Sequence, residues 1–122
     1  MVKRQTVQVE SFLDGLVNIY RLDENRKPVL FEKNIRFQNR VVGAKRNFDG
    51  EQAGYKIEKL IRIPKENLSI RGCFAVINGE QYQIIQAQNI YDTIPRCMAL
   101  TLAQPDILLN FDEMEAGAGG RV

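Results

Sequence analysis

The dipeptide Asn78-Gly79, which lies between two apolar runs, constrains the fold of this chain more than any other sequence feature. The runs cover residues 74–77 and 81–87. An Asn-Gly pair favours a type I′ turn, because both central residues of that turn have positive φ. We therefore predict an antiparallel hairpin. A third apolar run, at residues 97–103, would extend this hairpin into a three-stranded meander.

Other stretches also have the alternating apolar pattern or the composition of β-strands. They cover residues 7–9, 16–22, 29–37 and 55–63. Lys33 interrupts the apolar face of one of them, which indicates either a strand end with a partly buried lysine stem or a β-bulge. No segment shows a convincing 3.6-residue period. The predicted fold class is therefore all-β, as a small antiparallel β-barrel or sandwich of six to seven short strands with a long projecting loop.

The length of 122 residues predicts one domain with flanking segments. Residues 1–14 are expected to form an N-terminal arm or edge strand, and residues 15–111 the β-barrel domain. The long loop is placed at residues 39–54, where several glycines occur and no periodicity is visible. Residues 112–122, rich in Ala and Gly after an acidic start, are expected to form a flexible tail.

Composition argues against most enzyme classes. The chain has no histidine, and so it lacks the commonest general base and metal ligand. Its carboxylates occur in turns and polar stretches, without the spacing of a calcium loop, and no glycine-rich phosphate loop is present. We therefore expect no catalytic residues, no metal and no cofactor. Cys73 and Cys97 lie in separate apolar runs, which favours two buried free thiols.

The overall charge of +2 neither suggests nor excludes a nucleic-acid partner. No stretch resembles a signal peptide, and no apolar run approaches the roughly 18 residues of a membrane span. The expected site of synthesis and assembly is the cytoplasm, with no membrane partner.

The predicted loop at residues 39–54 has basic side chains in its first half and acidic side chains in its second half. One interpretation is a solvated connection. The other is a projecting arm whose basic half meets a phosphate backbone or an acidic partner. A single aromatic residue is too few for a base-stacking platform. The candidate functional residues are Arg40, Lys45, Arg46, Phe48, Asp49 and Glu51.

The chain resembles the head–tail joining (head completion, or stopper) proteins of long-tailed phages and prophages. It is especially similar to the small neck proteins of Bacillus-type prophages and phage-like elements. The likeness covers roughly residues 15–103. It is carried by Ile-Asn-Gly-Glu-Gln-Tyr-Gln-Ile-Ile at 77–85, by Met-Ala-Leu-Thr-Leu at 98–102 and by the stretch ending in Pro at 55–64.

This resemblance implies a non-enzymatic structural protein of the virion neck. Such proteins form a ring, usually twelve-fold, beneath the portal and its adaptor, and they dock the tail. A subunit can be monomeric when it is alone. A long loop projects into the channel and closes it after DNA packaging; here it maps onto residues 39–54, with Arg40, Lys45 and Arg46 as candidates to face DNA. Asp49 and Glu51 depart from a basic loop, so loop–loop pairing between neighbouring subunits is an equal alternative to non-specific DNA contact.

Two other functions fit the same pattern. The first is a minor capsid or tail-terminator (tail-completion) protein of a phage or prophage, which would use its loops to dock tail subunits. The second is a β-barrel module that binds single-stranded nucleic acid, for which exposed aromatic residues among basic ones would be needed.

Overall fold

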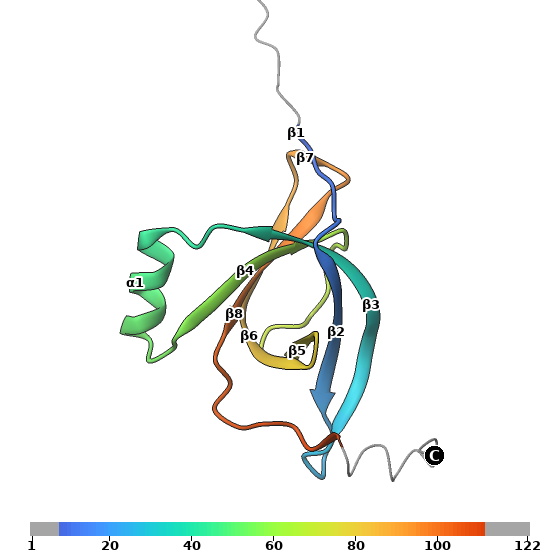
Figure 1. Cartoon of the computed structure of the whole chain (residues 1–122), viewed down its shortest axis with the longest axis vertical. Coiled ribbons are helices and arrows are strands. Elements are labelled where there is room, and N and C mark those ends of the chain that lie inside the picture. The colour runs from blue at the N-terminus through green and yellow to red at the C-terminus, as the bar shows by residue number, and fades with distance from the viewer. Residues whose placement is uncertain (1–7, 112–122) are drawn as a thin grey trace, which may run out of the picture.

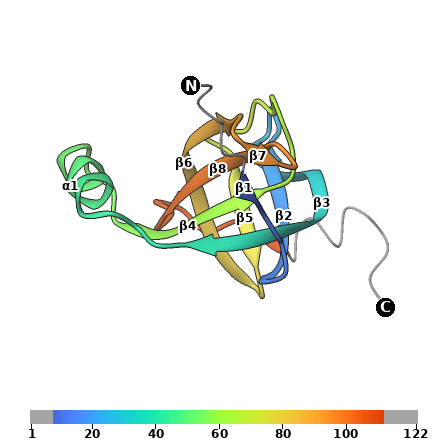
Figure 2. The same ribbon diagram turned by 90° about the horizontal axis from the view of Figure 1, so that it is seen from above.

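The computed structural model describes residues 8–111, and Figures 1 and 2 show the arrangement of its elements. The described part of the chain is mostly β, with one short helix. In chain order, the elements are β1 (Gln8–Val9), β2 (Gly15–Leu22), β3 (Pro28–Arg40), α1 (Ala44–Gln52), β4 (Ile57–Ile63), β5 (Phe74–Ile77), β6 (Glu80–Ile90), β7 (Thr93–Ile94) and β8 (Cys97–Ala103).

Six of the strands form an irregular antiparallel barrel. Their spatial order is β2-β3-β4-β8-β6-β5, and β5 pairs again with β2, so the ladder of strand pairs returns to its start. Register shifts interrupt the β2–β3, β4–β8 and β6–β8 pairs. The all-β prediction is therefore confirmed.

The predicted hairpin is present at the expected turn. Asn78 has a φ of 51° and Gly79 a φ of 80°, as a type I′ turn requires. The turn joins β5 to β6, and Ile77 pairs with Glu80 on either side of it. β8 then pairs antiparallel with β6, which completes the meander predicted from the three apolar runs.

The main core fills the barrel with aliphatic side chains, several of which are completely buried. Every residue of β8 is buried, on the outer as well as the inner face of the sheet. The outward Ala99 and Thr101 are small, and the side chain of Arg46 reaches Thr101 from α1. Both Cys73 and Cys97 are buried free thiols, as expected. The largest fully buried side chains are Phe37, Ile19, Ile61, Ile63, Ile70, Ile84, Leu100 and Leu102.

A β-bulge explains the position of Lys33. Val17 pairs with Ile35 but Ile19 pairs with Glu32, so two residues of β3 lie opposite one residue of β2. Asn34 has a φ of 53° in this bulge, and its backbone N–H donates a 2.7 Å hydrogen bond to the side chain of Asn18. The bulge changes the phase of β3, which leaves Lys33 exposed. Of the two sequence interpretations, the bulge is the one found.

The prediction that residues 39–54 form a long loop without a helix was wrong. β3 continues to Arg40, and α1 occupies nine residues of the segment. The helix was missed because its buried residue is Gly50 and its other inward side chain is Arg46, so it has no apolar periodicity. The segment does project: α1 stands out to one side of the barrel, beyond the ends of β3 and β4 (Figures 1 and 2).

The described part of the predicted N-terminal arm is fixed to the barrel end. β1 pairs parallel with β7 (Figure 1), and the backbone N–H of Glu10 donates to the carbonyl of Ile94 at 3.0 Å. Residues 1–7 of the arm and the predicted tail at 112–122 lie outside the described residues.

Candidate functional site

A cleft of about 670 Å³ lies between α1 and the outer face of the sheet formed by β4, β8 and β6. We call it the α1 cleft. It includes residues from α1, from the segments flanking it and from the barrel wall. These residues are Val41, Gly43, Lys45, Arg46, Asp49, Gly50, Ala53, Tyr55, Ile57, Leu60, Arg71, Ile85, Gln86 and Thr101.

Two contacts position α1 against the barrel. A Cβ atom on Gly50 would lie 2.6 Å from the side chain of Ile57, so the absence of a side chain at Gly50 allows the helix to approach β4. Arg46 extends from α1 to the sheet, where its guanidinium donates to the hydroxyl of Thr101 and, at 3.0 Å, to the side-chain carbonyl of Gln86. The helix is therefore held by a polar contact and a close backbone approach.

The cleft combines an apolar floor with an excess of positive charge. Lys45, Arg46 and Arg71 contribute three cations to its lining, and Asp49 contributes one carboxylate. Among residues 8–111, the side chains of Lys45 and Arg71 have no hydrogen-bond or ion-pair partner. Arg46 contacts only neutral groups, so its charge is also uncompensated. Such a site favours an anionic ligand that also carries apolar surface.

A second hollow, of about 410 Å³, continues from the α1 cleft across the same face of the sheet. Val41, Arg46 and Leu60 line both spaces. Arg40 and Arg62 add two further guanidinium groups to the second hollow. The outer face of the sheet is thus basic over both hollows.

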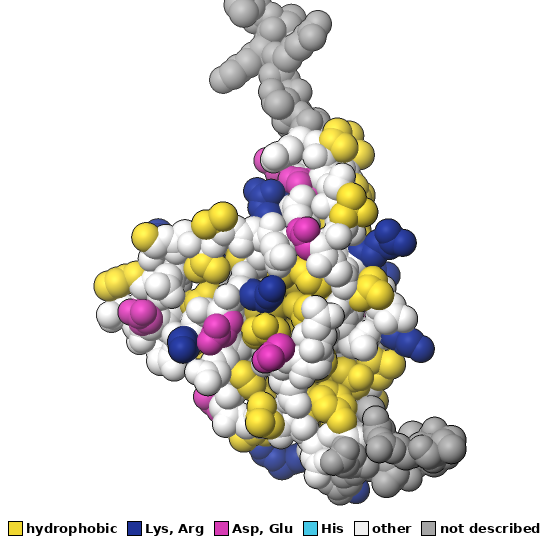
Figure 3. Space-filling model, viewed as in Figure 1, with side chains coloured by type: hydrophobic (Ala, Val, Ile, Leu, Met, Phe, Trp, Pro, Cys, Tyr) yellow, Lys and Arg dark blue, Asp and Glu magenta, His cyan; other side chains and the backbone are white. Residues whose placement is uncertain are grey.

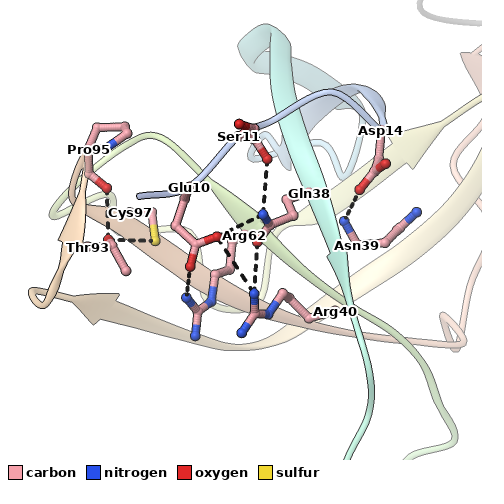
Figure 4. A network of polar contacts seen from close by, with 10 residues as sticks. All are labelled: Glu10, Ser11, Asp14, Gln38, Asn39, Arg40, Arg62, Thr93, Pro95 and Cys97. Atoms are coloured by element: carbon pink, nitrogen blue, oxygen red, sulfur yellow. Dashed lines mark hydrogen bonds and ion pairs between the residues drawn. The ribbon is translucent and has the colours of Figure 1, made fainter. Parts of the chain in front are cut away.

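Arg40 and Arg62, unlike the cations of the α1 cleft, share one carboxylate that the chain itself supplies. The Glu10 side chain is only 3% exposed, and one carboxylate oxygen accepts from Arg62 Nη1 at 3.1 Å (Figure 4). The other oxygen lies 3.7 Å from Arg40 Nη1 and accepts from Gln38 Nε2 at 2.8 Å. We call Glu10, Gln38, Arg40 and Arg62 the Glu10 cluster. It joins the N-terminal arm to β3 and β4.

Further hydrogen bonds fix the rest of the arm across β3. Gln38 Nε2 also donates to the carbonyl of Ser11 at 3.0 Å, and the backbone N–H of Asn39 donates to Asp14 at 2.7 Å (Figure 4). The backbone N–H of Asp14 in turn donates to the carbonyl of Phe37 at 3.0 Å. The arm from Glu10 to Asp14 is therefore an integral part of the barrel end.

The structure distributes the predicted site residues over three environments. Arg40 belongs to the Glu10 cluster, and Arg46 points back to the barrel. Lys45 and Asp49 line the α1 cleft. Phe48 and Glu51 are exposed on α1, with Phe48 at 59%. The predicted residues do not form one continuous DNA-facing loop surface.

Sequence reasoning missed Glu10, Arg62 and Arg71. Glu10 and Arg62 are 52 positions apart, and only the strand pairing brings them together. Arg71 lies in a turn whose approach to α1 has no local sequence signal. An acidic residue between apolar ones in an arm segment is a weak indication of a buried ion pair, and Glu10 has that pattern.

Within residues 8–111, no three His, Cys, Asp or Glu side chains come together in a way that could hold a metal ion. The single described helix is too short to cross a membrane.

Comparisons of the chain with protein-family models, with curated proteins and with solved structures give no match, so the functional assignment depends on the sequence and on the geometry described above.

Proposed function

We propose that this chain is a structural subunit of a phage neck, a head completion (stopper) protein that forms a ring under the portal. In this role it closes the DNA channel after packaging and offers a docking surface for the tail. Its partners are copies of itself, the portal or adaptor ring and tail-completion or tail proteins, and it requires no catalytic group. The basis is the sequence resemblance together with the surface of the barrel.

The observation that carries the proposal is that large apolar side chains are exposed at several separate places on the described surface, two of which are the α1 segment and the N-terminal arm. Val41 is 89% exposed and Phe48 59% exposed beside and on α1, whereas Val9 and Leu13 are 75% and 78% exposed on the N-terminal arm. Figure 3 shows apolar side chains over α1 and over the β1–β7 end of the molecule. A ring of identical subunits requires two different patches on each subunit, because each copy contacts its neighbours head to tail.

The projecting α1 segment supports the channel-closing part of the proposal. It extends from the barrel on the ends of β3 and β4 and carries Lys45, Phe48, Asp49 and Glu51 at its surface. These four side chains are the remaining candidates to meet DNA or a neighbouring subunit, since Arg40 and Arg46 are engaged by the barrel. The mixture of charges on α1 fits subunit–subunit contact at least as well as DNA contact.

Deletion of the gene, followed by electron microscopy of particles from the producing cells, tests the proposal. We expect empty or leaking heads next to separate, finished tails. Complementation with the intact gene should restore joined particles. Intact tailed particles, or filled stable heads with deformed tails only, would contradict a stopper role and favour the minor capsid or tail-terminator alternatives.

A nucleic-acid-binding module is less well supported by the geometry. Tyr20 and Phe37 are buried, and Phe31, Tyr55 and Tyr82 are half-buried. Exposed aromatic side chains in a row of basic residues, which a base-stacking surface needs, do not occur on the described β-barrel wall.

A further inference from the structure

The α1 cleft has a chemical composition that selects its ligand. Three cations and one carboxylate line it, and two of the cations, Lys45 and Arg71, have no partner among the described residues. The floor between them is made of the apolar parts of Tyr55, Ile57, Leu60 and Ile85. A ligand that fills this cleft should therefore present carboxylates around a flexible apolar side chain.

The chain itself contains a segment of this composition. Residues 112–115 read Asp-Glu-Met-Glu, which places three carboxylates around one methionine. Methionine is suited to an irregular apolar floor because it is unbranched and adaptable. The carboxylates would compensate the cations that the cleft leaves without partners.

The described residues that precede this segment contact both β2 and β6. The Phe111 ring packs edge-on against Tyr20 of β2, with 4.9 Å between ring centroids. The backbone N–H of Leu109 donates to Gln81 at 2.6 Å, and the Leu109 carbonyl accepts from Gln81 at 3.2 Å. In the order of the barrel, β2 is three strands from β8 in either direction.

The ring of Phe111, which directly precedes the acidic segment, is anchored at β2, and β2 contributes no residue to the cleft. Leu109 is held by Gln81 of β6. Head-to-tail association requires two different complementary sites on one subunit, and the cleft and the acidic segment would be such a pair.

We propose that residues 112–115 of one copy bind in the α1 cleft of a neighbouring copy. The inference rests on the proposed ring and names one contact that would hold its subunits together. A phosphate backbone would satisfy the same cations, but it would leave the apolar floor unused, and the half-buried Tyr55 is the only aromatic residue in the described lining.

A labelled peptide covering residues 110–118, titrated into the full chain and followed by fluorescence anisotropy, tests the contact. The titrated protein should carry Asp112→Asn, Glu113→Gln and Glu115→Gln, so that its own segment does not compete. We expect saturable binding that weakens about tenfold when Lys45→Glu and Arg71→Glu are introduced together. The same loss is expected when the three carboxylates of the peptide are neutralised.

A matched control reverses two cations elsewhere. Lys33 and Arg36 are exposed on β3, and Lys33→Glu with Arg36→Glu changes the net charge equally. Peptide affinity should then stay within about twofold, since the substituted cations do not line the cleft. Equal loss in both variants, no peptide binding, or tighter binding of a single-stranded oligonucleotide that the cleft variant alone abolishes would overturn the inference.

The outcome of the peptide titration can be distinguished from the outcome of the gene deletion that tests the proposed function. If the peptide fails to bind while gene deletion still gives unjoined heads and tails, the neck function stands and this contact is wrong. If the peptide binds but deletion leaves intact particles, the self-association is supported and the neck function is wrong.

Discussion

The Glu10 cluster and the α1 cleft lie next to each other on the same face of the sheet, yet they treat positive charge in opposite ways. In the Glu10 cluster, one carboxylate from the N-terminal arm forms ion pairs with Arg62 and Arg40. In the cleft, Lys45 and Arg71 have no partner among the described residues. Both regions depend on residues that are distant in sequence.

The difference indicates which charged residues of this surface stabilise the fold and which are available to bind a partner. A charge that the chain compensates internally fixes an element, as Glu10 fixes the arm to β3 and β4. A charge that the chain leaves uncompensated costs little in water and gains energy when an anionic partner arrives. If the comparison is right, substitutions in the two regions should separate stability from binding.

The largest expected effect on stability is that of Glu10→Gln. The substitution removes a buried negative charge and leaves the Arg62 guanidinium, only 18% exposed, without its counterion. We expect the free energy of unfolding to fall by about 2 kcal/mol, below the range for fully buried pairs because both arginines retain some solvent contact. Urea denaturation monitored by circular dichroism measures this change.

An exposed ion pair provides the control for Glu10. Glu66 lies 3.8 Å from Arg96, with side chains 37% and 62% exposed. Glu66→Gln should change the free energy of unfolding by less than about 0.5 kcal/mol, because solvent screens such pairs. Similar losses for Glu66→Gln and Glu10→Gln would mean that burial of Glu10 adds nothing, and the contrast between the two regions would fail.

The next effect concerns the contact that forms one wall of the cleft. In Gly50→Ala the new methyl group would lie 2.6 Å from Ile57 atoms, so either α1 or the Ile57 side chain must move. Overpacking costs about 1–3 kcal/mol, and the better helix propensity of alanine returns up to about 1 kcal/mol. We expect a net loss of about 1 kcal/mol in thermal or urea unfolding.

A double mutant with a change at Ile57 identifies the cause of that loss of stability. Combining Gly50→Ala with Ile57→Ala should cost less than the sum of the two single changes, since the second removes the atoms that clash. Gly43→Ala is the control, because a methyl group there meets nothing within 4 Å. Additive losses would show that Gly50 matters for a reason other than its approach to Ile57.

The parts of the fold that the sequence predicted are those with local signals. The Asn78-Gly79 turn determines its own φ values, and the alternation around Ile61 and Ile63 follows directly from burial of one strand face. The bulge at Lys33 was predictable as one of two alternatives because a charged residue in an apolar row needs an explanation.

The candidate site was much less predictable from the sequence, because the residues of α1 that face the barrel are of types usually found on the surface. Arg46 and Gly50 are the side of α1 that meets the barrel, and neither is apolar. Their pattern reads as a polar loop, which is what we predicted. The cluster of Glu10 with Arg62 depends on a pairing across 52 positions, and no single-sequence signal specifies such a partner.

A smaller effect is expected for Arg46→Met, which keeps an unbranched apolar stem and removes the guanidinium. The buried Thr101 hydroxyl would lose its short contact with Arg46, although the Gln86 side chain remains within 3.5 Å of it. We expect about 1 kcal/mol lower stability and faster hydrogen exchange at the amides of α1, since the tether to the sheet is gone. Lys45→Met on the same helix should change neither quantity, and equal exchange in both variants would mean that Arg46 is not the tether.

The smallest effect concerns two carboxylates, Glu58 of β4 and Glu80 of β6, on strands that also line the α1 cleft. Tyr82 of β6 lies near Glu80 and Glu58, and burial raises the pKa of its phenol above the usual 10.0, with the two carboxylates raising this pKa further. Because the pKa is higher in the folded than in the unfolded chain, the unfolded state releases its proton first. Stability is therefore unaffected by Tyr82 below the usual pKa of 10.0 and falls as the pH rises from there through the raised pKa of the folded state.

Removing the carboxylates should lower this pKa without returning it fully to 10.0, because burial is the larger cause. A titration of phenolate absorbance in Glu58→Gln with Glu80→Gln measures the shift, with Tyr82→Phe identifying the signal. The matched change in the α1 cleft, Lys45→Gln with Arg71→Gln, should leave the Tyr82 pKa unaltered, since neither residue is among the causes of its shift. Shifts of equal size and opposite sign for the two pairs would mean that Tyr82 senses the net charge of the whole barrel. Charges on this barrel would then not act locally, and the local pairing by which we distinguish the Glu10 cluster from the α1 cleft would lose its basis.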